Sequence, residues 1–151
     1  MSQFLGTHQN RVDAKGRVSV PAAFRTALRG AEGAAALILR PSHKHPCIEA
    51  WPEAVFSALA TPLETLDLFS EAHDDMAASL YADAYPIEPD KEGRVMLPEA
   101  LAAHAGLGDL VTFMGLGRIF QIWEPGAAVA FKAAARERAL SRGTLRAAAA
   151  G

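Results

Sequence analysis

One pattern of apolar and polar positions occurs twice along the chain. Segment 13–24 reads Asp-Ala-Lys-Gly-Arg-Val-Ser-Val-Pro-Ala-Ala-Phe, and segment 90–101, 77 residues later, reads Asp-Lys-Glu-Gly-Arg-Val-Met-Leu-Pro-Glu-Ala-Leu. The Asp, Gly, Arg, first Val and Pro coincide, and the core positions around them stay apolar. A second match relates 48–52 to 121–125. These matches indicate that the chain is an internal duplication.

Each copy predicts the same succession of elements. The Asp-x-x-Gly-Arg segment predicts a turn, because Gly accepts a backbone conformation that side chains resist, and the alternation after it predicts a strand. The following Pro favours the first turn of a short helix, which a later Gly ends. The helices are predicted over 22–28, before Gly30, and 99–104, before Gly106; further strands are predicted over 36–39, 47–51, 110–114 and 119–123.

Three further helical segments lie outside this repeated unit. A proline precedes a predicted helix near 53–60, and another precedes one from 126 towards 142. Between the copies, apolar residues at three- and four-residue spacing predict one amphipathic helix over 63–80: Leu63, Leu66, Phe69, Ala72, Met76 and Leu80. The exposed face of that helix is acidic. The Ala-rich end, 144–151, has no periodicity and is expected to fray.

The two copies are expected to share one core. A copy of about 45 residues has too few strands and too little apolar surface to close a core alone. The prediction is therefore an α+β, mainly β, fold: a pseudo-twofold β-barrel with short helices at its ends and two longer flanking helices. The expected divisions are a first repeat over 4–52, linking helices over 53–83, a second repeat over 84–125 and a C-terminal helix with a frayed tail over 126–151.

Composition bounds the class of protein. The chain has 151 residues, half of them apolar and 21% charged, as in globular domains. No apolar run reaches the roughly 18 residues of a membrane span, and the first six residues lack the features of a secretion signal. The single Cys47 has no partner for an internal disulfide, which fits a reducing compartment. We therefore expect a cytoplasmic protein with no membrane partner.

Charge is distributed unevenly along the chain. Residues 1–45 carry seven basic and two acidic side chains, residues 46–124 carry three and fourteen, and the remainder carries five and one. This asymmetry suggests that the N-terminal segment faces a polyanion. Ordinary scatter of surface charge is the alternative.

The sequence offers little for catalysis or metal binding. It has no nucleophile elbow, P-loop or dinucleotide-binding motif, so we expect neither an enzyme nor a cofactor. His43, His45 and Cys47 alternate as metal ligands would on one side of a strand, but a fourth ligand is not evident. A structural role for these residues is favoured. Trp51 and Trp123 recur with the repeat, which favours core packing over base stacking.

The duplicated turn is the main candidate for a functional site. In a structural interpretation, each Asp binds turn amides and pairs with the Arg four residues later. In a functional interpretation, the Asp orients that Arg toward a base edge or phosphate, and neighbouring cations neutralise the DNA backbone. The extra cations of the first copy favour the second interpretation. The candidate DNA-binding residues are Asp13, Lys15, Gly16, Arg17 and Arg25 in the first copy and Asp90, Gly93 and Arg94 in the second.

At these residues the chain resembles the MraZ family, bacterial transcriptional regulators built from two SpoVT-AbrB-type swapped-hairpin domains. The resemblance covers approximately residues 4–124. It includes Phe4-x-Gly6, the first turn with Pro21 and Phe24-Arg25, His45-Pro46-Cys47, the second turn with Leu97-Pro98, His104-Ala105-Gly106-Leu107 and Gly115–Trp123. Two such motifs in this order and separation are specific.

The resemblance implies an AbrB-like swapped-hairpin barrel and a sequence-specific DNA-binding repressor of the division and cell-wall gene cluster that contains its own gene. The implied partners are double-stranded DNA of that promoter and further copies of the chain in a ring-like homo-oligomer in the nucleoid region. The acidic linking segment departs from the family, so no DNA contact is assigned to it. Because Glu92 and Glu99 lie near Arg94, Arg17 is expected to contribute more than Arg94. The alternative function is an oligomeric protein-interaction module without DNA specificity.

Overall fold

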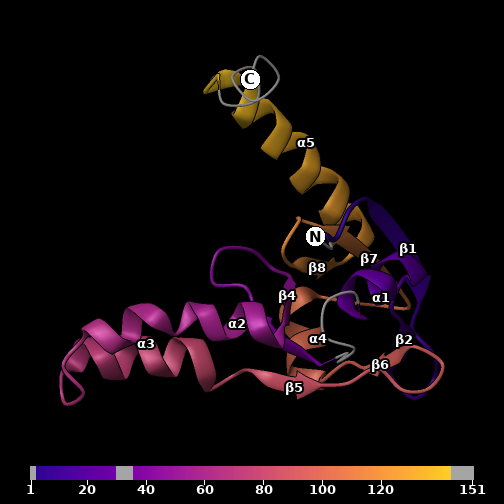
Figure 1. Ribbon diagram of the computed structural model, residues 1–151. Coiled ribbons are helices and arrows are strands. Elements are labelled where there is room, and N and C mark those ends of the chain that lie inside the picture. Colours follow the sequence, from indigo (N-terminus) through magenta and orange to yellow (C-terminus); the bar gives the residue numbers. More distant parts are fainter. Residues whose placement is uncertain (1–2, 30–35, 144–151) are drawn as a thin grey trace.

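The computed structural model describes residues 3–29 and 36–143, and it has an α+β fold (Figure 1). Its strands are β1 (Thr7–Arg11), β2 (Arg17–Ser19), β3 (Leu37–Pro41), β4 (Ile48–Pro52), β5 (Tyr85–Ile87), β6 (Arg94–Met96), β7 (Leu110–Gly115) and β8 (Phe120–Trp123). Its helices are α1 (Ala22–Arg29), α2 (Glu53–Leu59), a 3-10 helix (Thr61–Thr65), α3 (Glu71–Tyr81), α4 (Glu99–Ala105) and α5 (Pro125–Ser141). The predicted helix stop at Gly30 and the predicted fraying of 144–151 lie outside the described residues.

The short helices form where the prolines predict them. Pro21 and Pro98 directly precede α1 and α4, where a residue without an N–H group leaves no hydrogen bond unmade. α4 ends at Gly106, whose φ of 62° lies in the left-handed region that commonly terminates helices. Phe24 on α1 and Leu101 on α4 are almost fully buried, so both helices pack one apolar face on the core.

The hydropathy pattern does not predict two of the strands. β1 has the sequence Thr-His-Gln-Asn-Arg, without an apolar side chain, and β5 is a three-residue strand that contains Pro86. Each pairs with a strand of the other repeat, β1 with β7 and β5 with β3, so the two pairs are equivalent. Pairing with a neighbouring strand therefore stabilises these segments where their own sequence favours no strand.

Strands of the two repeats are interleaved in the sheets. The larger sheet has the order β1-β7-β8-β4-β3-β5, and β2 pairs with β6 in a separate two-stranded sheet. All of these pairs are antiparallel. Four of them, β1 with β7, β4 with β8, β3 with β5 and β2 with β6, join one repeat to the other. The sheets therefore depend on both repeats.

The closed barrel predicted from the sequence is not found among the described strands. β1 and β5 are the edges of the larger sheet, and the β2–β6 ladder is not continuous with it. Pro21 and Pro98 follow the short strands and have no N–H group with which to extend a ladder. Before them, Val20 and Leu97 donate to the carbonyls of Gly93 and Gly16, at 2.9 and 3.0 Å. Side chains, and not a continuous ladder, close the core on this side.

The core contains residues of both repeats, as expected. Val18 and Val95 enter it from β2 and β6 and are at most 2% exposed. They join one cluster with apolar residues of the larger sheet and of α1 and α4. In this cluster the Phe24 ring lies 4.9 Å from the Phe120 ring, which joins the first-repeat helix to a second-repeat strand. The β2–β6 pair, called the ribbon below, is therefore held on the core by its inner face.

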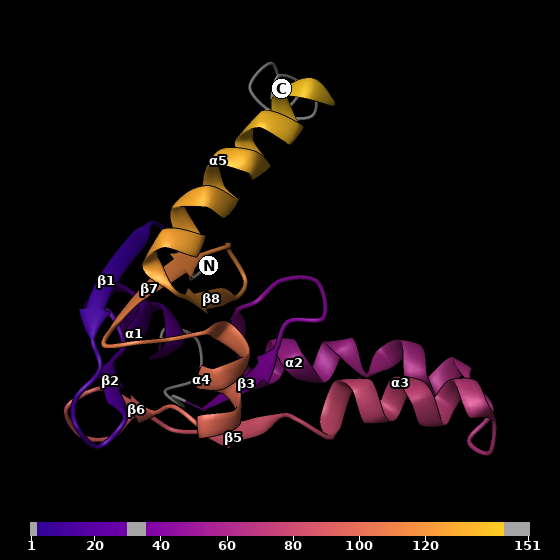
Figure 2. The same ribbon diagram turned by 180° about the vertical axis from the view of Figure 1, so that it is seen from behind.

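The segment between β4 and β5 forms a helical hairpin that projects away from the ribbon (Figures 1 and 2). The single helix predicted over 63–80 is wrong, because the 3-10 helix stops before an extended Leu66 and α3 starts again at Glu71. Ser70 causes this restart, since its hydroxyl accepts a hydrogen bond from the His73 N–H at 3.1 Å. Phe69, in the break, is 89% exposed. The acidic hairpin stands apart from the candidate DNA-binding residues.

Candidate nucleic-acid interface

The ribbon presents both turn arginines on one outer face. Arg17 is opposite Met96, Val18 is opposite Val95 and Ser19 is opposite Arg94. Side chains alternate between the faces of a strand, and directly paired residues share a face. Since Val18 and Val95 point into the core, Arg17 and Arg94 both point outward. They occupy diagonal positions, which in antiparallel pairs lie about 7–8 Å apart.

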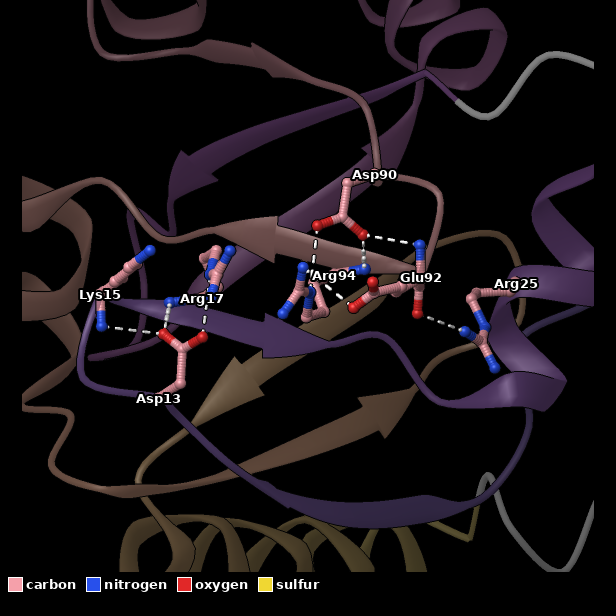
Figure 3. Close-up of polar contacts among 7 residues, drawn as sticks. All are labelled: Asp13, Lys15, Arg17, Arg25, Asp90, Glu92 and Arg94. Carbon is pink, nitrogen blue, oxygen red and sulfur yellow. Dashed lines mark hydrogen bonds and ion pairs between the residues drawn. The ribbon is translucent and has the colours of Figure 1, made fainter.

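The first turn holds Arg17 through one carboxylate (Figure 3). Asp13 Oδ1 accepts hydrogen bonds from the backbone N–H groups of Lys15 and Arg17, at 2.9 and 2.8 Å. Asp13 Oδ2 accepts a third from Arg17 Nε at 2.8 Å. Gly16 has a φ of 84°, which allows the chain to turn between them. The Asp thus fixes the turn and orients the guanidinium together.

The second turn repeats this arrangement. Asp90 Oδ1 accepts from the backbone N–H groups of Glu92 and Arg94, both at 2.9 Å, and Oδ2 accepts from Arg94 Nε at 3.0 Å. Gly93 has a φ of 79°. The structural interpretation of the turns is therefore correct for their geometry. It is compatible with the functional one, because binding through Nε leaves the Nη groups of Arg17 without an ion-pair partner among the described residues, so they can meet another acceptor.

The hydrogen bonds keep both aspartates ionised. The N–H of Arg17 is the main cause that lowers the pKa of Asp13 from its ordinary value, and the Arg17 side chain contributes further. The N–H of Arg94 does the same for the pKa of Asp90. Partial desolvation opposes both shifts. Each arginine therefore faces a carboxylate at neutral pH.

The two arginines differ in their remaining partners. Arg94 Nη2 also forms an ion pair with Glu92 at 3.0 Å. Among the described residues, Arg17 forms an ion pair with Asp13 alone. Lys15, which occupies the position equivalent to Glu92, is exposed and adds positive charge to the first turn. The first turn therefore offers more unneutralised cationic charge beside its arginine.

Arg25 does not lie beside Arg17, where the sequence pattern predicts it. Its Nη1 donates to the Glu92 carbonyl at 3.0 Å (Figure 3). Its side chain also lies against Gly93 of the second turn. The reason is the pairing of β2 with β6, which places the start of α1 next to the opposite repeat's turn. Lys91, which sequence reasoning did not select, belongs to that same turn. The swapped-hairpin fold implied by the family resemblance was the available signal, because an exchange of strands between the copies brings Arg25 to the second turn.

The other candidate residues have structural surroundings. Within the described part of the chain, no three His, Cys, Asp or Glu side chains gather as a metal site. Cys47 is buried, and burial raises the pKa of its thiol to about 12. The His45 ring packs 4.7 Å from the Phe131 ring. Trp123 is buried and stacks on the Phe131 ring. The described helices are too short or too polar to cross a membrane.

Known proteins match the chain over both repeats. A family model described as "MraZ protein, putative antitoxin-like" matches residues 3–78 and again residues 80–148. The transcriptional regulator MraZ of Gluconacetobacter diazotrophicus is 67% identical over 140 residues, covering 91% of this chain and 89% of that protein. The protein of the same name from Gluconobacter oxydans is 62% identical over 148 residues, covering 97% and 90%. Because the two matches of the model follow the two copies of the turn, ribbon strand and helix, this chain belongs to the MraZ family.

Proposed function

We propose that the chain is a sequence-specific DNA-binding transcriptional regulator that reads DNA with the outer face of the β2–β6 ribbon. One observation carries this proposal: two aspartate-oriented arginines lie on the same exposed face of a two-stranded ribbon. The major groove of B-DNA, about 12 Å wide, admits a two-stranded β-ribbon. Arg is the side chain that most often reads guanine there, through two hydrogen bonds to O6 and N7.

The assigned residues have separate roles in this proposal. Arg17 and Arg94 contact base edges, while Asp13 and Asp90 hold their guanidinium groups in place before DNA arrives. Preorganised side chains lose less conformational entropy on binding. Lys15 and Arg25 supply phosphate contacts, which fix the position of the protein on the duplex without reading sequence. Gly16 and Gly93 let the backbone make the two turns.

The assembly is part of the proposal. We infer that copies of the chain assemble into a ring-like homo-oligomer. We also infer that the strand pairs between the repeats make each chain a pseudo-dimer of AbrB-like swapped hairpins. A single ribbon has few base contacts, whereas several linked ribbons gain effective concentration on repeated sites. The relatives named as transcriptional regulators support a role in transcription. We further propose that the chain represses its own division and cell-wall gene cluster, in the cytoplasm at the nucleoid. Catalysis has no part in this function.

A gel-shift titration with the DNA upstream of the chain's own gene tests the proposal. The control is a shuffled duplex of the same length and composition, at the same salt concentration. We expect the upstream duplex to bind at least tenfold more tightly than the shuffled one, since specific sites commonly exceed non-specific DNA by 10³ or more. Equal binding to both duplexes would instead favour the protein-interaction module.

A further inference from the structure

A small hollow lies beside the second turn, where α1 meets the opposite repeat. Its volume is about 110 Å³, enough for several water molecules or one phosphate group. It is lined by Arg25, Leu28, Arg29, Pro89, Asp90, Lys91 and Gly93. The first repeat supplies the helix wall and the second repeat supplies the turn wall. The site therefore exists only because strands of the two repeats pair.

The lining of the hollow favours an anion. Arg25, Arg29 and Lys91 contribute three positive charges, against the single carboxylate of Asp90. That carboxylate is already occupied, because it accepts hydrogen bonds from two backbone N–H groups and from Arg94 Nε. The Glu92 carboxylate, the nearest other negative charge of this turn, is paired with Arg94. A net positive charge remains in the hollow.

The hydrogen bonds of these cations are incomplete. Arg25 Nη1 donates to the Glu92 carbonyl, but its Nε is buried and has no hydrogen-bond partner among the described residues. A buried donor without a partner costs free energy, so the present contacts of Arg25 leave its hydrogen bonds incomplete. Within residues 3–29 and 36–143, the hydrogen bond of the Arg29 side chain is a 3.5 Å contact from its Nε to the Arg25 carbonyl, and Lys91 is exposed. Guanidinium groups and an ammonium group are the donors that phosphate groups prefer.

We propose that this hollow binds one phosphate group of the DNA backbone, with Arg29 and Lys91 as additional phosphate-binding residues beside Arg25. The proposal rests on the function proposed above, which it extends to the second turn. The same turn carries Arg94, so a phosphate held here fixes the duplex next to the base that Arg94 reads. Arg29 and Lys91 also give the second turn positive charge, which offsets the negative charge of Glu92.

Three glutamine variants test the hollow. Arg29→Gln and Lys91→Gln, alone and combined, remove charge from exposed side chains while keeping part of their length. Arg118→Gln, which removes an exposed cation between β7 and β8, is the matched control. The affinity of each variant for the upstream duplex is measured between 50 and 200 mM salt. The measurement is repeated with duplexes that carry one uncharged methylphosphonate at successive positions.

For the double variant we expect the salt slope to be lower by about 0.9 for each phosphate that it no longer binds. Between 50 and 200 mM salt, its affinity should then fall by about 3.5-fold less than that of the wild type for each hollow engaged. The methylphosphonate that weakens wild-type binding at this position should not weaken the double variant. If the double variant does not fold, Lys91→Gln alone should show the same loss of sensitivity, because Lys91 lies in an exposed turn.

Two results would overturn the inference. One is a double variant whose salt slope and methylphosphonate profile match those of Arg118→Gln. The other is a shift of the Gly93 amide resonance on addition of inorganic phosphate, with no change of the methylphosphonate profile in the variants. That result would assign the hollow to a free oxyanion. Failure of the proposed function is distinguishable, because it would appear as equal wild-type affinity for upstream and shuffled duplexes. In that case, a salt slope that is lower in the hollow variants than in the wild type would still support the phosphate site, without sequence-specific binding.

Discussion

Arg17 and Arg94 show how identical local geometry can have different electrostatic surroundings. Each guanidinium is held through Nε by the aspartate four residues earlier, at 2.8 and 3.0 Å. Arg94 shares its second edge with Glu92, whereas the equivalent position in the first turn is Lys15. DNA must compete with Glu92 for Arg94. DNA approaches Arg17 beside the positive charge of Lys15.

The Arg17→Ala variant should therefore lose most of its preference for the upstream duplex. Removal of a bidentate base contact costs about 1–3 kcal/mol per site, and the costs add over the subunits engaged. The melting temperature should change little, since the Arg17–Asp13 ion pair, whose side chains are 28% and 35% exposed, contributes at most about 1 kcal/mol. Arg94→Ala should weaken binding less. Gel shifts and thermal melts measure both effects, and Arg17→Lys controls for charge without the planar fork.

Two outcomes would contradict this assignment. A folded Arg17→Ala protein with unchanged preference would remove Arg17 from the interface. An Arg17→Ala protein that fails to fold would favour a purely structural role for the turn. Lys15→Ala serves as a comparison, because removal of a phosphate-binding side chain should lower affinity for every duplex and reduce the salt slope.

The aspartates make stability depend on pH in a defined direction. Their pKa values are lower in the folded chain than in the unfolded one, so their stabilisation is complete above the ordinary Asp pKa, about 4. It is lost as pH falls from there through the lowered values. The melting temperature should therefore decline below about pH 4. An Asp13→Asn, Asp90→Asn double variant should decline less over the same range; parallel profiles would contradict the linkage.

At the scale of elements, the contact between α1 and the second turn makes the two halves of the ribbon unequal. A Cβ built on Gly93 would overlap the Arg25 side chain, whereas one on Gly16 would meet only the Met96 sulfur, at 3.5 Å. Both glycines have positive φ. A side chain is thus strained at both positions, but only the second has a neighbour that must move.

Gly93→Ala should consequently destabilise the fold more than Gly16→Ala. The positive φ costs about 1–2 kcal/mol at both positions. At Gly93, displacement of Arg25 from the Glu92 carbonyl should add about 1 kcal/mol. Urea unfolding measures the free energies, and the matched control repeats both substitutions in an Arg25→Ala background, where their costs should become equal. A difference that persists in that background would exclude Arg25 as its cause.

The elements differ in how far their own sequence predicts them. α1 and α4 begin after Pro21 and Pro98, and the turns are closed by residues four positions apart, so local chemistry is sufficient. The prediction of one helix over 63–80 is wrong because the spacing of apolar residues indicates an apolar face but does not show where a helix is interrupted. Ser70, a residue type that favours helix starts, was the available signal. β1 and β5 depend on partners that are distant in sequence.

At the scale of the whole molecule, four of the six strand pairs of the described residues join one repeat to the other. β1 and β2 pair with β7 and β6, and β4 pairs with β8. A fragment of residues 1–62 should therefore be unfolded, or should associate with a second copy to replace the missing strands. Circular dichroism and light scattering distinguish these states. A stable monomeric fragment with cooperative unfolding would refute the shared core as the source of stability.

The full chain should associate in solution. Leu68 and Phe69, in the helical hairpin, are 62% and 89% exposed, and α3 has no buried residue among those described. Exposed apolar groups of this kind commonly mark contacts between proteins. Light scattering at micromolar concentration should give a mass several times the 16.0 kDa of one chain. A mass of one chain at that concentration would argue against the oligomer.

The sequence alone determined the features whose partners are close along the chain. The duplication can be read directly from the repeated sequence, and the two Asp-x-x-Gly-Arg turns and the helices after the prolines rest on hydrogen bonds or conformational preferences spanning a few residues. Only the tertiary structure decided which copy each element meets. Arg25 is eight residues from Arg17 but contacts Glu92, 67 residues away, because β2 pairs with β6. Burial of the shared core stabilises the pairing of strands from different repeats. A local pattern of apolar and polar residues does not indicate which distant strand a segment pairs with.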